Sequence, residues 1–235
     1  MLHKAWIYAN LLFSFLQIPV GFWLQGAFGK ERSPVIPAGY AFSIWSLIFA
    51  GSLVYSIYLA APAHRNFYYL RKIAPFTAVA FFLSCFWMVV AKTASDANLW
   101  LTIPVIIGLF TVLALAFFSL HEKGVVLNRT EKWCILYPVS LYFGWVSVAL
   151  FANIASIAAD QGFMPLWFSI LLVALAGSLA AWITFLARNT TYGLAAIWGL
   201  IGIVITNVLV TNSSMIGISI LMSLMIFFTL FKSFR

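Results

Sequence analysis

The amino-acid sequence predicts an all-α integral membrane protein with about eight transmembrane helices. Of its 235 residues, 64% are hydrophobic and only 8% are charged. The apolar residues form eight long stretches, and the short loops between them carry nearly all the charge. A water-soluble fold with so few polar groups could not cover its surface, whereas a bilayer solvates apolar side chains directly. We therefore expect a membrane-embedded helical bundle.

Each stretch is long enough to cross a bilayer as a helix, since about 18 to 25 residues at 1.5 Å per residue span ~30 Å of hydrocarbon. A β-barrel would need strands of ~10 residues with alternating polarity, and residues 168–176 do not alternate. The first stretch follows Lys4 as a signal peptide would, but it is long and lacks a small-residue cleavage pattern, so a helix is expected there too. The predicted spans are residues 5–25, 36–60, 74–91, 98–120, 133–159, 164–187, 193–210 and 214–231.

The distribution of Lys and Arg predicts the orientation, because short cytoplasmic loops are enriched in these residues. With eight spans, the side that carries both termini holds ten of the 13 basic residues, and the other side holds Lys30, Arg32 and Lys92. We expect both termini in the cytoplasm, in a bacterial plasma membrane. The net charge of +8 then reflects topology. The basic aromatic loop at 64–72 could suit nucleic acid, but anchoring at the bilayer surface explains it better, so no nucleic-acid partner is expected.

Few ionisable groups lie inside the predicted spans, which limits the possible functions. Ion-coupled pumps usually need a charged side chain within the bundle, and here all five acidic residues fall in loops or at helix ends. Ion coordination by backbone carbonyls stays open, because Pro19, Pro104 and Pro138 interrupt three spans. The three histidines lack metal-ligand spacing, and no catalytic triad or phosphate loop is present, so neither a metal site nor an enzyme is expected.

Two of the ten tryptophans are in unusual places. Trp45 and Trp145 lie well inside their spans, where the indole N–H needs an acceptor that lipid cannot supply. They should therefore face protein or a cavity. Tryptophans near span ends suit the headgroup region. These are Trp6, Trp23, Trp100, Trp133, Trp167 and Trp182.

On the helix face that carries each inner tryptophan, the neighbouring positions hold aromatic and small residues. A stripe of small residues also suits a plain helix–helix contact, but the large aromatic rings and the amide beside them favour a seam that is partly open. At 1.5 Å per residue, Trp45, Trp87, Ala149 and Asn153 reach the outer half of the bundle, with Ser84 one turn deeper. The stripes are Phe42, Trp45, Phe49, Ser52 and Ser56 in the second span, and Pro138, Tyr142, Trp145, Ala149, Asn153 and Ser156 in the fifth.

These residues resemble a known family. The run from Pro37 through Gly39 to Trp45 is similar to the signature that opens the second helix of the TspO/MBR family of tryptophan-rich sensory proteins, related to the translocator protein. The fifth span, with Tyr142, Trp145, Ala149 and Asn153, has the spacing of that family's fifth-helix motif. The resemblance covers about residues 1–160. The second-helix signature is one residue shorter than the usual form between Tyr40 and Trp45.

The resemblance implies a five-helix bundle that binds porphyrins, haem or sterols in a cavity capped by residues 26–35. It implies ligand contacts for Trp45, Trp87, Ala149 and Asn153, with Trp145 and Tyr142 as wall or packing residues. Ser84 departs from the family pattern, because an asparagine is common at its position. The candidate ligand-binding residues are Tyr40, Phe42, Trp45, Phe49, Ser84, Trp87, Tyr142, Trp145, Ala149 and Asn153.

The last three spans exceed the five-helix plan. We expect a domain at residues 1–160 and three additional helices at 161–235 packed on it, because small residues recur at four-residue spacing, as in Ala174 with Ser178. Residues 197–201 echo residues 44–48; in so apolar a chain, chance explains this better than an inverted repeat. The extra helices could replace a homodimer contact, so the chain could be a monomer or a homodimer.

The leading functional prediction is a sensory or binding protein for a hydrophobic planar molecule such as a tetrapyrrole, which would be a ligand and not a required cofactor. The alternatives are a transporter of the same ligands and a porphyrin-degrading enzyme. The expected partners are the lipid bilayer and a hydrophobic small molecule.

Overall fold

The computed structural model describes residues 2–23, 33–64, 67–93 and 96–233, and within these ranges every regular element is helical. Eight of the described helices are long and apolar enough to cross a membrane, which confirms the predicted fold class. They are α1 (Leu2–Trp23), α2 (Ile44–Ala60), α3 (Tyr68–Thr93), α4 (Thr102–Leu120), α6 (Tyr137–Asp160), α7 (Leu166–Ala187), α8 (Thr190–Val208) and α9 (Ser213–Ser233).

The second span begins later than its hydropathy predicts. Residues 33–38 form a turn and extended backbone, the 3-10 helix η1 (Gly39–Ser43) follows, and α2 starts only at Ile44. Pro34 and Pro37 explain the delay, because proline lacks an N–H donor and disfavours helical backbone in the residue before it. The segment 33–43 therefore runs along the bundle as non-helical or 3-10 backbone.

The fifth predicted span is also interrupted near its start. The short helix α5 (Arg129–Glu131) leads into a π-helical turn, η3 (Lys132–Leu136), before α6 begins. Pro138 accounts for the wider turn. Its ring clashes with the carbonyl four residues earlier, and proline has no N–H to donate to that carbonyl. A second short 3-10 helix, η2 (Asp96–Leu101), precedes α4.

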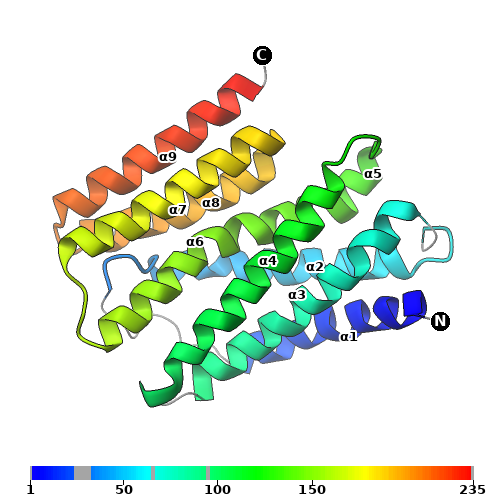
Figure 1. Ribbon diagram of the computed structural model, residues 1–235, viewed down its shortest axis with the longest axis horizontal. Helices are drawn as coiled ribbons and strands as arrows, with labels where there is room; N and C mark the ends of the chain where they lie inside the picture. Colours follow the sequence, from blue (N-terminus) through cyan, green and yellow to red (C-terminus); the bar gives the residue numbers. More distant parts are fainter. Residues whose placement is uncertain (1, 24–32, 65–66, 94–95, 234–235) are drawn as a thin grey trace.

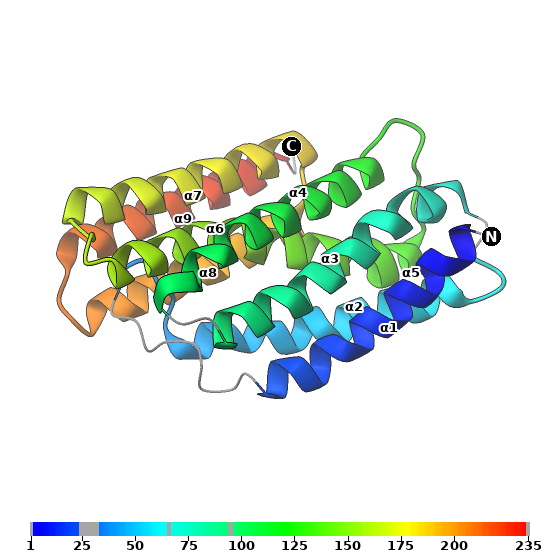
Figure 2. The ribbon, with the colours of Figure 1, turned by 60° about the horizontal axis from the view of Figure 1, so that its bottom comes forward.

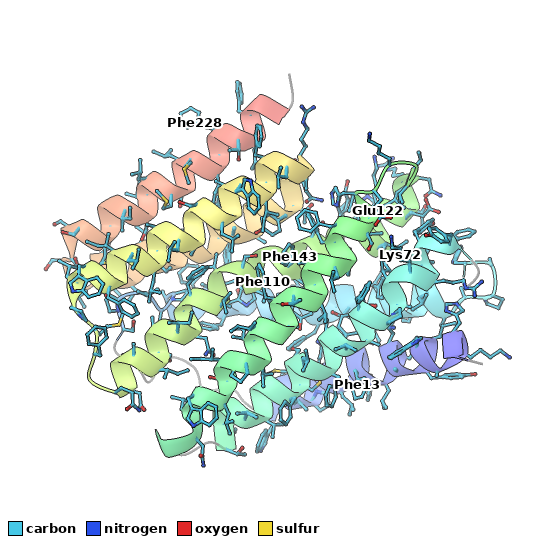
Figure 3. All side chains as sticks on the ribbon, viewed as in Figure 1. Phe13, Lys72, Phe110, Glu122, Phe143 and Phe228 are labelled. Atoms are coloured by element: carbon cyan, nitrogen blue, oxygen red, sulfur yellow. The ribbon has the colours of Figure 1, made fainter. Side chains whose placement is uncertain are left out.

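Five of the helices form a closed ring. Around it, α1 packs on α2, α2 on α6, α6 on α4, α4 on α3, and α3 on α1 again. Aromatic side chains pack where its helices meet, for example Phe110 on α4 against Phe143 on α6, whose ring centroids are 5.1 Å apart and whose side chains meet near the centre of Figure 3. A ring of this kind has an interior that side chains can fill or leave open.

The other three long helices pack against the outside of this ring. Helices α7 and α8 contact α6, and α9 packs on both α7 and α8. Figures 1 and 2 show these three helices along one flank of the molecule and α1, α2 and α3 on the opposite flank, with α6 between them. One apolar core runs through both groups. On the outer face, side chains such as Phe228 of α9 point away from the bundle and are exposed, as suits contact with lipid (Figure 3).

Polar contacts join the helices at the end of the bundle where the α2–α3 and α4–α5 connections lie. Lys72 of α3 and Glu122 after α4 form an ion pair, and their side chains point toward one another in Figure 3. His121, which caps α4, donates from Nδ1 to the carbonyl of Phe117 (2.7 Å), and its Nε2 lies 3.2 Å from Nδ2 of Asn189. Because an amide nitrogen only donates, Nε2 must accept, so the ring is neutral.

Acidification is expected to destabilise this end of the bundle through His121. Burial lowers the pKa of His121 below its ordinary value of 6.5. The folded protein therefore binds this proton more weakly than the unfolded chain. The contribution of neutral His121 to the free energy of unfolding is complete above pH ~6.5 and is lost as the pH falls below that value. The melting temperature in detergent should fall between about pH 7.5 and about pH 5. A His121→Gln variant should lose this part of the pH dependence, and an unchanged profile in that variant would contradict the assignment.

Candidate ligand cavity inside the five-helix ring

The ring encloses a small cavity near the start of α2. Its volume is about 90 Å³, and its wall is mainly apolar and aromatic. The side chains come from the 33–43 segment, α2, the last turns of α3, the η2–α4 junction, and the second half of α6. The lining residues are Ile36, Pro37, Phe42, Trp45, Trp87, Ala91, Leu99, Thr102, Trp145, Ala149, Ala152, Asn153, Ser156 and Ile157.

Three aromatic rings form one wall of this cavity. Trp145 is 1% exposed and meets Trp45 edge to face, with ring centroids 6.3 Å apart. Phe42 packs edge to face on Trp145 from the other side, at 5.7 Å. The indole Nε1 of Trp145 is buried and has no hydrogen-bond partner among the described residues. A buried donor without a partner costs about 1–3 kcal/mol.

A chain of hydrogen bonds forms another part of the wall. Trp87 donates from Nε1 to Oδ1 of Asn153 (2.9 Å), Asn153 donates from Nδ2 to Oγ1 of Thr102 (2.9 Å), and Thr102 donates to the carbonyl of Leu99 (2.8 Å). These bonds join α3, α6 and α4 across the ring. Asn153 uses one donor and one acceptor of its amide in this chain, and its bond to the indole N–H orients Trp87.

A larger groove adjoins the cavity between α1 and α2. Its volume is about 700 Å³. Phe42 and Trp45 belong to the walls of both spaces and therefore separate them. The groove residues are Ile18, Gly21, Phe22, Gly39, Phe42, Ser43, Trp45, Ser46, Phe49, Ala50, Leu53 and Met88.

The structure brings six of the ten sequence-predicted site residues into the wall of the cavity. They are Phe42, Trp45, Trp87, Trp145, Ala149 and Asn153. Phe49 lines only the groove. The remaining three lie elsewhere, because their positions along the helix did not reveal how each helix is rotated.

These three residues lie outside the cavity wall, and the packing of Tyr142 agrees with the packing role that the resemblance implies for it. Tyr40 lies on the far side of η1, is 42% exposed, and packs edge to face on Trp198 of α8. Tyr142 is buried against Trp45, with Gln17 donating to its hydroxyl at 3.3 Å. Ser84 is fully buried on α3 and does not line the cavity. Of the predicted cap at residues 26–35, residues 26–32 lie outside the described part of the chain, and 33–35 belong to the segment that precedes η1.

Several lining residues carry little or no signal in the sequence. Thr102 is the most informative, because its hydroxyl ends the hydrogen-bond chain from Trp87; its position as a polar residue near the start of an apolar span was the available signal. Ile36 and Pro37 were assigned to a helix and Ala91 to a helix end, and nothing in their spacing marked them as lining residues. Gly21 and Ile18 of the groove gave no signal either.

The fold and the cavity together define an integral, multi-pass membrane protein with an aromatic internal cavity. The chain belongs to the TSPO-like protein family, whose model matches residues 7–231. The match includes α7, α8 and α9 as well as the ring, so it extends past the region of the sequence motifs. No curated protein and no solved structure matches the chain. Membership places the protein among membrane proteins of ligand-binding or transport type.

Proposed function

We propose that this protein is a membrane receptor for a hydrophobic planar molecule, such as a tetrapyrrole, which binds between the aromatic rings inside the five-helix ring. The observation that carries the proposal is the aromatic cavity wall, in which Trp45 and Trp145 meet edge to face. Aromatic faces favour a flat apolar ligand, and a mainly apolar wall with few polar groups is typical of small-molecule sites.

The sizes of the two spaces support entry from the bilayer. The cavity of about 90 Å³ is smaller than the ~300 Å³ at which pockets for drug-sized ligands begin. The adjoining groove of about 700 Å³ falls in the usual range. A ligand that enters the groove from lipid would therefore need Phe42 and Trp45 to turn aside so that the two spaces become one.

Titration of the purified protein with protoporphyrin tests the proposal. We expect saturable 1:1 binding, measured by a shift of the porphyrin absorbance band and by quenching of tryptophan fluorescence. Sterol and carotenoid added as competitors define the ligand class. Quenching that does not saturate, or that empty detergent micelles reproduce, would contradict a specific site.

The Trp45→Ala variant is expected to bind protoporphyrin more weakly but faster. It removes one aromatic contact, at a cost of about 1 kcal/mol, and it also removes the partition between groove and cavity. Association and dissociation rates measured by stopped-flow fluorescence should both rise, with dissociation rising more. Phe86→Ala is the control, because Phe86 is 46% exposed on α3 and lines neither space. A slower association in Trp45→Ala would argue against entry through the groove.

Transport is the second candidate, because prolines lie inside α1 and α3 and at the start of α6, and the groove lies between two apolar helices, α1 and α2. Ligand uptake into proteoliposomes separates transport from binding, and saturable binding without flux would exclude transport.

Members of this family are in general not enzymes, and we propose the same for this chain. Incubation with porphyrin in light, followed by absorbance spectroscopy, tests this, since a new product would contradict it.

We also propose that the protein lies in a bacterial plasma membrane with both termini in the cytoplasm. The excess of Lys and Arg on the side of the termini supports this orientation. Reporter fusions that are active only in the cytoplasm, placed at each terminus, test it.

A further inference from the structure

Helix α8 lies beside the segment 33–43, although the two are far apart in the sequence. Trp198 of α8 donates from Nε1 to the carbonyl of Ala41 (2.9 Å). One turn later, the carbonyl of Gly202 accepts from the backbone N–H of Ala38 (3.0 Å). Both contacts are made to backbone atoms of the segment.

The contacts continue to the end of α8. Thr206 donates from its hydroxyl to the carbonyl of Ile36 (2.9 Å), and Asn207 donates from Nδ2 to the carbonyl of Pro34 (2.7 Å). Trp198, Gly202 and Thr206 are four residues apart and so share one face of the helix. As α8 advances, its partners step backward along the segment, so the two run in opposite directions side by side.

Gly202 permits this close approach. A Cβ atom at this position would lie 2.8 Å from the Cβ atoms of both Ala41 and Pro37, closer than carbon atoms pack. The ring of Tyr40 adds an edge-to-face contact with Trp198, at 5.5 Å between centroids. The face of α8 therefore fits the segment in shape as well as in hydrogen bonding.

The segment needs such a partner because its backbone is not α-helical. Non-helical backbone at membrane depth is tolerated only where protein satisfies its polar groups, since lipid cannot. The carbonyls of Pro34 and Ile36 obtain donors from α8 side chains. The same segment supplies Ile36, Pro37 and Phe42 to the cavity wall, whereas none of the described lining residues belongs to α8.

We propose that α8 is a positioning element for the ligand site, in which Trp198, Thr206 and Asn207 fix the segment 33–43 and thereby the wall and the partition residue Phe42. This gives the helices beyond the five-helix ring a role in ligand retention, which rests on the proposed binding function. These three are positioning residues, because they act on the ligand only through the segment.

The Thr206→Val variant tests the proposal, because it removes the hydroxyl and keeps the shape of the side chain. Hydrogen exchange followed by mass spectrometry should show faster exchange in peptides covering residues 33–43. Protoporphyrin dissociation should be about tenfold faster, as expected for one lost buried hydrogen bond. Thr229→Val is the matched control, since that hydroxyl donates to the carbonyl of Ile226 in its own helix, α9. A second variant, Trp198→Phe, removes the indole N–H and keeps an aromatic ring against Tyr40.

The possible outcomes separate the two proposals. Faster exchange together with faster dissociation in both variants, and in neither with Thr229→Val, supports the positioning role. Unchanged exchange in the 33–43 peptides overturns it, as does faster exchange with unchanged dissociation. If the unaltered protein shows no saturable porphyrin binding, the binding function itself fails and the positioning role fails with it.

Discussion

Replacing Gly144 with alanine should destabilise the protein by about 3 kcal/mol, the upper part of the range for overpacking in a well-packed core. Gly144 lies on α6 where that helix crosses α8. An added Cβ would overlap the carbonyl oxygen of Tyr192 and lie 2.9 Å from the Cβ of Ala195. A backbone carbonyl cannot turn aside as a flexible side chain can, so the two helices would have to separate. Thermal denaturation in detergent, followed by size-exclusion chromatography, measures the effect.

Gly217→Ala is the control for this prediction. Gly217 lies on α9, and nothing would lie within 4 Å of its added Cβ. Alanine is favoured over glycine inside a helix by about 1 kcal/mol, so this variant should melt at the same or a higher temperature. If Gly144→Ala were as stable as Gly217→Ala, the close contact between α6 and α8 would be wrong. The pair thus tests whether the C-terminal helices pack on the ring as described.

Replacing Ala149 with leucine should abolish ligand binding while the fold is kept. Ala149 lies on α6 in the cavity wall, and the cavity of about 90 Å³ is close in size to a leucine side chain. Filling an apolar space adds buried surface, at about 25 cal/mol per Å², so the melting temperature should be unchanged or higher. Protoporphyrin affinity should fall by at least about tenfold, or about 1.4 kcal/mol. Absorbance titration and thermal denaturation on one preparation give both values.

Ala174→Leu provides the comparison, because Ala174 is half-buried on α7 and lines neither the cavity nor the groove. It should leave porphyrin affinity unchanged. A stable Ala149→Leu protein that binds porphyrin as well as the unaltered protein would place the ligand elsewhere. A protein that loses both stability and binding would instead show that the cavity wall cannot accept a leucine, and Ala152→Val, a smaller change in the same wall, then takes its place.

The residues expected at the site line the cavity where one helix carries the pattern, and fewer of them do so where several helices have to be combined. Trp145, Ala149 and Asn153 share a face of α6, so their common exposure to the cavity follows from the helical repeat alone. Tyr40 and Trp45 are separated by the change from a 3-10 helix to an α-helix at Ile44, which a uniform helical repeat does not include. Tyr40 therefore faces α8 and not the cavity.

The sequence by itself determined that this chain spans a membrane eight times, because hydropathy depends on each stretch alone and on no contact with another. It also predicted that Trp145 is surrounded by protein, since an indole N–H inside a span cannot be satisfied by lipid. Only the tertiary structure decided that the last three helices pack on the ring through α6, that Trp45 divides a cavity from a groove, and that Trp198 holds the backbone at Ala41. These features depend on the order and rotation of the helices. Uniformly apolar helix surfaces can pack in many ways, and specific hydrogen bonds and close contacts, such as those of Gly144 and Gly202, select one packing.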